Sequence, residues 1–161
     1  MALAYFGILS GGIPSTLYWR VDVYGSPGVN FKLGTWNFFT GTFSYSATTA
    51  TAYINAANPT TGTSTLPIGP YGTITLGTSG ANPVFNGTQL ADVQIYNVSL
   101  SSAEVLALYQ EGIGGAPIDV NNLVGWWPLN GNANDYSGFS NNGNAVSVSY
   151  TNSWTSGYVQ P

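Results

Sequence analysis

Residues 85–112 read FNGTQLADVQIYNVSLSSAEVLALYQEG, and this stretch decides the fold. It opens with Asn86-Gly87, a dipeptide typical of tight turns because both residues tolerate positive φ. Residues 91–96 then alternate between two faces, which predicts a half-buried strand with one face in water. The buried face would carry Ala91, Val93 and Ile95, and the wet face Asp92, Gln94 and Tyr96.

A short helix is predicted directly after this strand. Ser101 and Glu104 have the capping-box spacing, in which the Ser101 hydroxyl accepts from the Glu104 amide and the Glu104 carboxylate accepts from the Ser101 amide. Gly112 suits the left-handed end of a helix. The sequence therefore predicts a helix over residues 102–110.

This strand and helix together resemble the closing segment of the laminin-G-like (concanavalin A-like) jelly-roll family. The resemblance rests on the strings FNG, ADVQIYN, LSSAEV and LY, in that order within residues 85–109. In the family, the last long strand runs into a short helix that lies against the sandwich. The resemblance implies an all-β, antiparallel jelly-roll β-sandwich with one short helix, and it identifies a fold better than an activity.

The preceding residues supply further strands. Strict alternation makes residues 16–24 the clearest of them, and the apolar residues 1–10 predict a buried strand. Residues 56–67, rich in Thr, Gly and Pro, predict a loop. Strands are also expected at 29–33, at 34–43 and 50–55, which resemble a hairpin of the family, and at 71–77.

The order of the segments is unusual. Residues 123–143 resemble the opening of a laminin-G-like domain, with an apolar strand ending in Trp-Pro, an Asp-x-Ser-Gly turn and Asn-Gly. The chain is therefore divided into a main portion (1–112), a linker (113–122) and opening strands (123–161). Three explanations stay open: a circular permutant that closes on itself, a piece of a tandem array, or a subunit that exchanges strands with its neighbours.

The composition excludes several classes of function. Only 5% of the 161 residues are charged, far below the ~25% of ordinary soluble domains, so the solubility rests on uncharged polar groups or on a covered surface. Two basic residues and a net charge of −4 argue against nucleic acid as a partner. The chain has no Cys and no His, which removes Ser-His, Cys-His and zinc-thiolate chemistry. No apolar run approaches the ~20 residues of a membrane span.

Two carboxylates are candidate calcium ligands. Asp135 lies in an Asp-Tyr-Ser-Gly turn, where it either forms an Asx-turn with the backbone two residues on or supplies an oxygen to calcium. Relatives of this fold carry calcium near the domain opening, so the resemblance also implies such a site. Asp92 would be the second oxygen donor or a buried hydrogen-bond acceptor.

Carbohydrate is the other ligand considered. Aromatic side chains stack on sugar rings where they are exposed, and otherwise pack in the core or against another subunit. The candidates are Tyr18, Tyr24, Tyr71, Trp126 and Trp154. Asn86 and Asn97 stand in N-glycosylation acceptor patterns.

These features predict an extracellular, non-catalytic structural module. The expected role is a cell-surface filament subunit or an adhesive repeat, whose partners are copies of itself or neighbouring repeats. The alternative is a carbohydrate-binding module that recognises surface glycans, with or without calcium. A glycosidase is not expected, because the six acids lack the Glu-x-Asp-x-x-Glu spacing seen in catalytic relatives of this fold.

Overall fold

The structure is a computed structural model. It describes the backbone of residues 2–8, 16–18, 28–30, 32, 34–44, 46–63, 76 and 89–151, and the side chains of these residues from position 32 onward. Its elements are β1 (Ala2–Ile8), β2 (Thr16–Tyr18), β3 (Gly28–Asn30), β4 (Trp36–Ser44), β5 (Thr49–Ile54), β6 (Ala57–Thr63), β7 (Gln89–Tyr96), α1 (Ser102–Glu111) and β8 (Leu123–Trp127).

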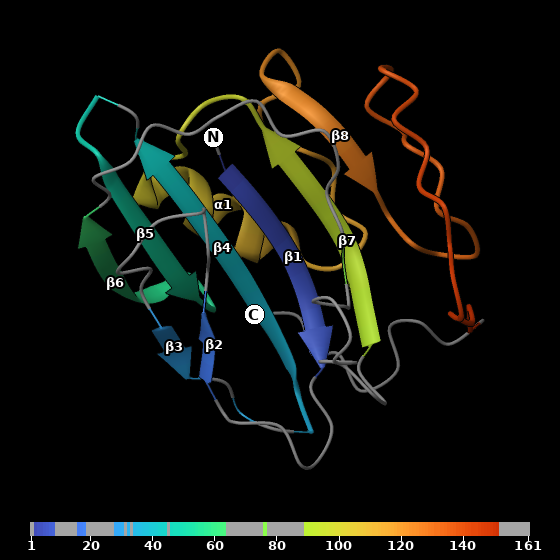
Figure 1. Cartoon of the computed structure of the whole chain (residues 1–161), viewed down its shortest axis with the longest axis horizontal. Coiled ribbons are helices and arrows are strands. Elements are labelled where there is room, and N and C mark those ends of the chain that lie inside the picture. The colour runs from blue at the N-terminus through green and yellow to red at the C-terminus, as the bar shows by residue number, and fades with distance from the viewer. Residues whose placement is uncertain are drawn as a thin grey trace.

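Six of the strands form one antiparallel sheet in the order β6-β5-β4-β1-β7-β8 (Figure 1). The N-terminal strand β1 lies in the middle, between β4 and β7. The last strand, β8, pairs with β7, so the segment that resembles a domain's opening lies beside the segment that resembles its end, within one chain.

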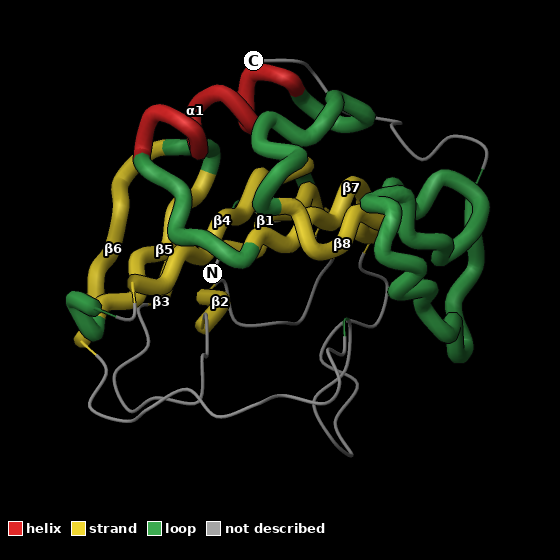
Figure 2. The backbone as a smooth tube through the Cα atoms, turned by 90° about the horizontal axis from the view of Figure 1, so that it is seen from above, coloured by secondary structure: helices red, strands yellow, loops and turns green. Residues whose placement is uncertain are grey.

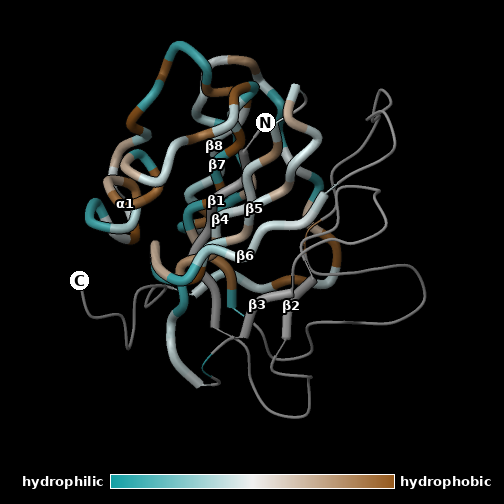
Figure 3. Tube along the Cα trace, turned by 90° about the vertical axis from the view of Figure 1, so that its left-hand side faces the viewer, coloured by the Kyte–Doolittle hydropathy of each residue, from teal (hydrophilic) through white to brown (hydrophobic). Residues whose placement is uncertain are grey.

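The sheet is covered on both faces. The helix α1 lies over one face, and the small β2–β3 sheet lies on the other side (Figure 2). An end-on view shows the same layers, with α1 and the β2–β3 pair on opposite sides of the large sheet (Figure 3). Strand β4 is buried along both of its faces, as is most of β7. The predicted all-β antiparallel sandwich with one short helix is thus confirmed.

The core between α1 and the sheet is apolar and aromatic. Val105 and Leu108 are the buried residues of the helix, and the Phe38 ring of β4 stacks on Tyr109 with 5.7 Å between the centroids. The buried cluster consists of Phe38, Tyr53, Ala91, Tyr96, Leu100, Val105, Leu108 and Leu123.

The predicted helix is confirmed, and it is one residue longer than the sequence indicates. Both bonds of the capping box are present: the Glu104 amide donates to the Ser101 hydroxyl over 3.4 Å, and the Ser101 amide donates to the Glu104 carboxylate over 2.7 Å. The Ser101 hydroxyl also donates to the Glu104 carboxylate over 2.6 Å, and this bond and then the bond from the Ser101 amide lower the pKa of Glu104. Gly112 ends the helix with φ 75°.

The predicted loop at 56–67 is wrong, because residues 57–63 form β6. Asn55 and Ala56 have φ of 51° and 54°, so they make the tight two-residue turn that joins β5 to β6. Pro59 fits in β6 because the strand lies at the edge of the sheet, where one side of the backbone needs no partner.

The predicted wet face of β7 is also wrong. Residues 91–96 are all buried, including Asp92 and Gln94. The alternation is interrupted at Asp92, where the register shift brings Ala91 into the same buried cluster as Tyr96, so the predicted grouping of Ala91 with Val93 and Ile95 is wrong. In addition, α1 and the residues that follow it cover the side of the sheet that was expected to face water.

Other predicted strands are described only in part. The strand at 16–24 is described over 16–18 and the strand at 71–77 only at residue 76, and the remaining residues lie outside the described part of the chain. Residues 128–151 are described throughout and contain no strand.

The capping box gives the first prediction. Replacing Glu104 by Ala removes the acceptor of the Ser101 amide, so the free energy of unfolding should fall by about 1 kcal/mol. Urea unfolding measures the change. Glu111→Ala, at the exposed other end of the same helix, is the matched control, and an equal loss in both variants would contradict the assigned role of the cap.

Candidate functional site

The polar side chains of β7 gather where this strand meets β8. Asp92 has φ 53°, and the pairing of β7 with β1 shifts register between Ala4 and Phe6. This irregularity is a β-bulge, a feature that redirects a side chain. The Asp92 amide donates to the Pro128 carbonyl oxygen over 3.2 Å, which continues the register of β7 with β8 one pair beyond Val93 and Trp127.

Asp92 lies in a continuous network of hydrogen bonds, here called the β7–β8 network, which consists of Asp92, Gln94, Tyr96 and Trp126. Asp92 Oδ1 accepts from Trp126 Nε1 over 2.8 Å and from Gln94 Nε2 over 3.3 Å. The Tyr96 hydroxyl donates to Gln94 Oε1 over 2.6 Å. The network therefore links two strands through side chains as well as through the backbone ladder.

The segment that follows α1 covers the β7–β8 network. The backbone of Gly114 acts to lower the pKa of Asp92, and the backbone of Ile118 acts to lower the pKa of Tyr96, so both lie beside the network. Asp92 is 3% exposed and Tyr96 is fully buried. The network is thus an internal structure and offers no carboxylate to solvent.

Burial governs the protonation of both groups. Burial raises the pKa of Asp92 above its ordinary value of 3.8, although the bonds from Trp126, Gln94 and Gly114 act in the opposite direction. Burial also raises the pKa of Tyr96 well above its ordinary range, so the phenol keeps its proton and remains a donor to Gln94. Of the two basic residues of the chain, Lys32 is exposed and Arg20 lies outside the described residues.

Asp135 organises the irregular segment after β8, here called the edge loop (residues 128–143). Its Oδ1 accepts from the amides of Trp126 and Ser137 over 2.9 and 2.8 Å. Its Oδ2 accepts from the Ser137 hydroxyl over 2.9 Å and from the Asn141 amide over 2.8 Å. The bond to the Ser137 amide is the Asx-turn that the sequence offered as one of two roles for Asp135.

The pKa of Asp135 lies below its ordinary value. Partial burial acts to raise it, but the bonds from the Trp126, Ser137 and Asn141 donors prevail. The carboxylate is therefore charged at neutral pH, and protein donors already occupy both of its oxygens.

The edge loop also occupies the outer side of β8. The Val124 carbonyl oxygen accepts from the Ser137 hydroxyl and from the Asn141 side-chain amide, over 3.2 and 2.9 Å. The Trp126 carbonyl oxygen accepts from the Tyr136 amide over 2.8 Å. Together with Asp135 on the Trp126 amide, these contacts satisfy backbone groups that an edge strand normally exposes.

The two calcium candidates bind different atoms of one residue. Both contact Trp126, but Asp92 binds the indole Nε1 and Asp135 binds the main-chain amide. Among the described residues no group of three or more Asp, Glu, His or Cys side chains is placed to hold a metal ion. A calcium site built on Asp92 and Asp135 stays a prediction.

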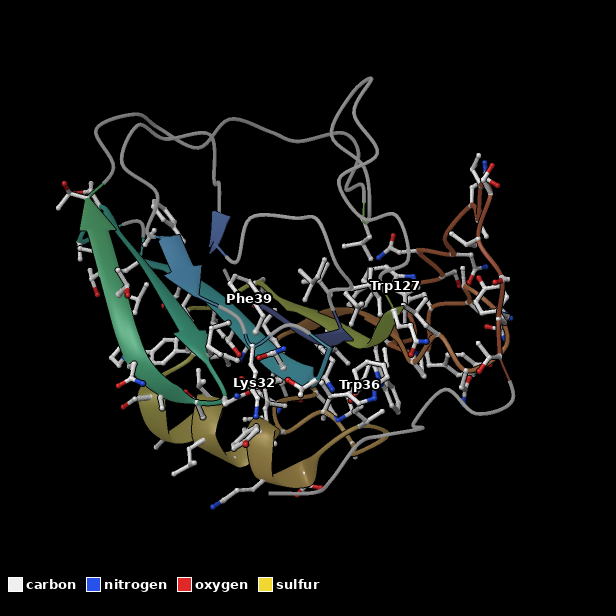
Figure 4. The ribbon with its side chains drawn as sticks, turned by 90° about the horizontal axis from the view of Figure 1, so that it is seen from below. Lys32, Trp36, Phe39 and Trp127 are labelled. Carbon is white, nitrogen blue, oxygen red and sulfur yellow. The ribbon has the colours of Figure 1, made fainter. Side chains whose placement is uncertain are left out.

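Of the sugar-stacking candidates, only Trp126 has a described side chain. It is half-buried against the core, and its ring meets Tyr136 edge-on at 6.2 Å. Its neighbour Trp127 lies with Phe39 on the face of the sheet away from α1 (Figure 4). The side chains of Tyr18, Tyr24, Tyr71 and Trp154 lie outside the described residues.

Of the two glycosylation candidates, only Asn97 lies among the described residues. Asn97 is exposed in the bend after β7, and its amide donates to the Asn122 carbonyl oxygen over 2.9 Å. Asn86 lies outside the described residues. An exposed Asn97 is compatible with glycosylation, which stays a prediction.

Sequence reasoning missed the roles of Gln94 and Tyr96. The alternation placed them correctly on one face of β7 together with Asp92, but it assigned that face to water. Three polar residues on one face of a strand indicate an internal network only when another element is known to cover that face. Here α1 and the residues that follow it cover it, and the sequence alone does not show this.

The fold and the site define an antiparallel β-sandwich whose polar groups serve to hold its last strands together. A laminin-G-type family model, described as the concanavalin A-like lectin/glucanases superfamily, matches residues 5–106. The chain belongs to this superfamily. No curated protein matches the sequence significantly. No helix among the described residues is long and apolar enough to cross a membrane.

Asp92 gives a prediction about pH. Because its pKa is raised in the fold, its contribution to stability is full below about pH 4 and is lost as the pH rises through the folded-state pKa. Asp92→Asn mimics the protonated acid and keeps an oxygen for Trp126. The Tm of this variant minus that of the parent should therefore grow between about pH 4 and pH 7. Thermal unfolding followed by circular dichroism measures it.

The matched control for this experiment is Glu111→Gln, an exposed acid at the end of α1. A difference in Tm between Asp92→Asn and the parent that stays constant with pH, or falls as the pH rises, would contradict a raised pKa for Asp92.

Asp135 gives a prediction about the edge of the sheet. Asp135→Ala deprives the Trp126 amide of its acceptor, so this amide should exchange with deuterium at least tenfold faster, which corresponds to a loss of about 1.4 kcal/mol. Mass-spectrometric hydrogen exchange measures the rate. Asn134→Ala changes the neighbouring exposed side chain as a control, and unchanged protection of Trp126 in Asp135→Ala would refute the assigned contact.

Proposed function

We propose that this protein is a non-catalytic structural module of a cell surface, either a filament subunit or an adhesive repeat, which joins copies of itself or neighbouring repeats through its sheet. The observation that carries the proposal is the contrast between the two edges of the large sheet. At one edge the edge loop satisfies the outer backbone groups, and at the other, here called the open edge, no described strand lies on the outer side.

The open edge is β6. Six of its seven residues are exposed, and no described strand pairs with its outer side. It carries no charged residue, although Lys at an edge is a common protection against pairing with another chain. A bulge at Asn58, with φ 48°, and Pro59 interrupt only its first half. Residues 60–63 remain regular and offer backbone groups to a partner.

The acids support a non-catalytic role. Hydrolysis of a glycosidic bond needs two carboxyl groups that face each other across the substrate. Asp92 is buried in the β7–β8 network, Asp135 is saturated with donors, and Glu104 caps α1. Asp119 binds the Asn122 side chain over 2.9 Å. Each of these four acids thus has a structural partner.

The surface supports an extracellular setting. With 5% charged residues, the protein presents mainly Thr, Asn, Ser and Gly to solvent, and a surface of this kind is best kept soluble when it is covered by neighbours or by attached sugar. The exposed acceptor pattern at Asn97 agrees with this setting.

Carbohydrate binding is the second candidate, and exposed aromatic side chains on the edge loop favour it. Tyr136 is 53% exposed and Phe139 is 65% exposed. Rings on an irregular loop can stack on sugars, and the superfamily description includes lectins. A glycan array that retains the parent protein but not a Phe139→Ser variant would favour this candidate.

The structural proposal predicts self-association that depends on β6. The parent should form species larger than a monomer as its concentration rises, and Thr60→Lys should shift them to monomer because a charge on an edge opposes pairing. Light scattering after size-exclusion chromatography and negative-stain microscopy measure the assembly. Ala47→Lys, in the exposed turn between β4 and β5, is the matched control, and a parent that stays monomeric at all concentrations would refute the proposal.

A further inference from the structure

An exposed apolar segment follows the edge loop. In residues 144–150 the larger side chains alternate with serines, and they are exposed: Val146 by 71%, Val148 by 62% and Tyr150 by 38%. This period of two is typical of a strand with one buried face. Residues 144–150 nevertheless belong to no strand of the structure. The pattern of a strand is thus present without a sheet to pair with.

The adjacent sheet edge cannot take this segment. The outer side of β8 is already bonded to Asp135, Tyr136, Ser137 and Asn141 of the edge loop. Pairing there would require these contacts to break. Of the two edges of the large sheet, β6 is the one without such contacts among the described residues.

While Asn141 stays bonded to Asp135 and to the Val124 carbonyl oxygen of β8, the segment that begins three residues later cannot lie along β6 of its own molecule. The sheet order places β5, β4, β1 and β7 between β6 and β8, and five steps of ~4.8 Å between neighbouring strands separate the two edges by roughly 24 Å. The two edges lie on opposite sides of the molecule, with the edge loop beyond β8 (Figure 1). A second copy is therefore the chain whose β6 the segment can meet.

The two partners match in chemistry. Both β6 and residues 144–150 span seven residues, and neither carries a charge, so no repulsion opposes their pairing. Ser147 has φ 55°, a left-handed conformation that costs free energy in a residue with a side chain. Pairing as an extended strand would release this cost and place Val146, Val148 and Tyr150 on one face.

We propose that residues 144–150 of one copy pair with the open edge of β6 in the next copy and extend its sheet by one strand. The inference rests on the proposed function, since it names the contact through which copies join. The donor segment, residues 144–150, and the acceptor strand, β6, lie at opposite ends of the sheet, so the contact is head-to-tail. A head-to-tail contact gives rings when the rotation between copies closes and filaments when it does not.

Cysteine cross-linking between two singly substituted chains tests this contact, because the natural chain has no Cys. Ser149→Cys marks the donor segment, and Thr60→Cys and Thr61→Cys mark β6 in separate preparations that cover both faces. Mixing donor and acceptor under mild oxidation should give a disulfide-linked dimer, identified by mass spectrometry. Ala47→Cys, mixed with the same donor, should give at least tenfold less.

A second substitution distinguishes cross-links that form through strand pairing from cross-links that form by random collision of two cysteines. Val148→Asp in the Ser149→Cys chain should abolish the cross-link, whereas Ser147→Asp, which adds the same charge beside it, should have the smaller effect because its side chain points away from the buried face. Both positions are exposed, so neither change should lower the Tm of the monomer.

The outcomes distinguish this contact from the broader function. Assemblies that persist while the cross-link is absent and Val148→Asp is without effect overturn this contact and leave the structural role standing. A parent that never assembles overturns both.

Discussion

The pairing of β1 with two strands at once is the constraint on which the rest of the structure depends. Strand β1 pairs with β4 over seven residues without interruption and with β7 through a single irregularity. Without it, the sheet would separate into one half containing β4–β6 and another containing β7 and β8. Each half would then expose backbone groups that are buried in the sandwich, and unpaired backbone groups in an interior cost free energy comparable to a lost hydrogen bond.

The irregularity between β1 and β7 also determines where the polar residues go. The Asp92 amide donates to the Pro128 carbonyl oxygen, one pair beyond Val93 and Trp127 in the register of β7 with β8. Once Asp92 is buried, its carboxylate needs donors, and Trp126 and Gln94 supply them. The hydroxyl of Thr40 shows the contrast, because it is fully buried and is the buried side-chain atom without a hydrogen-bond partner among the described residues. The buried Asn37 of β4, like Asp92, has hydrogen-bond partners, which it finds at Lys32 and Thr35.

Local patterns predicted the parts of the structure that are determined locally. The capping box and Gly112 fixed the helix to within one residue, and the alternation in 91–96 located β7. The loop expected at 56–67 failed because Ala56 adopts positive φ, which its residue type does not signal, and because an edge strand accepts Pro59. The Asx-turn of Asp135 could be foreseen, but its bond to the Trp126 amide, nine residues away, depends on how β8 pairs with β7.

The two edges of the sheet show how a chain with few charges can control pairing. Ordinary edge strands are protected by Lys or by charges that point inward, and neither β6 nor β8 carries a charged residue. At β8 the protection is a set of hydrogen bonds from Asp135, Ser137 and Asn141 that occupy its outer groups. At β6 a bulge and one Pro act on the first half alone. Among the described residues the two edges of the sheet therefore differ: hydrogen bonds from the edge loop occupy the outer groups of β8, whereas no described strand pairs with the outer side of β6. This difference follows from the hydrogen bonds of a single loop, because without them the outer backbone groups of β8 would lack these partners.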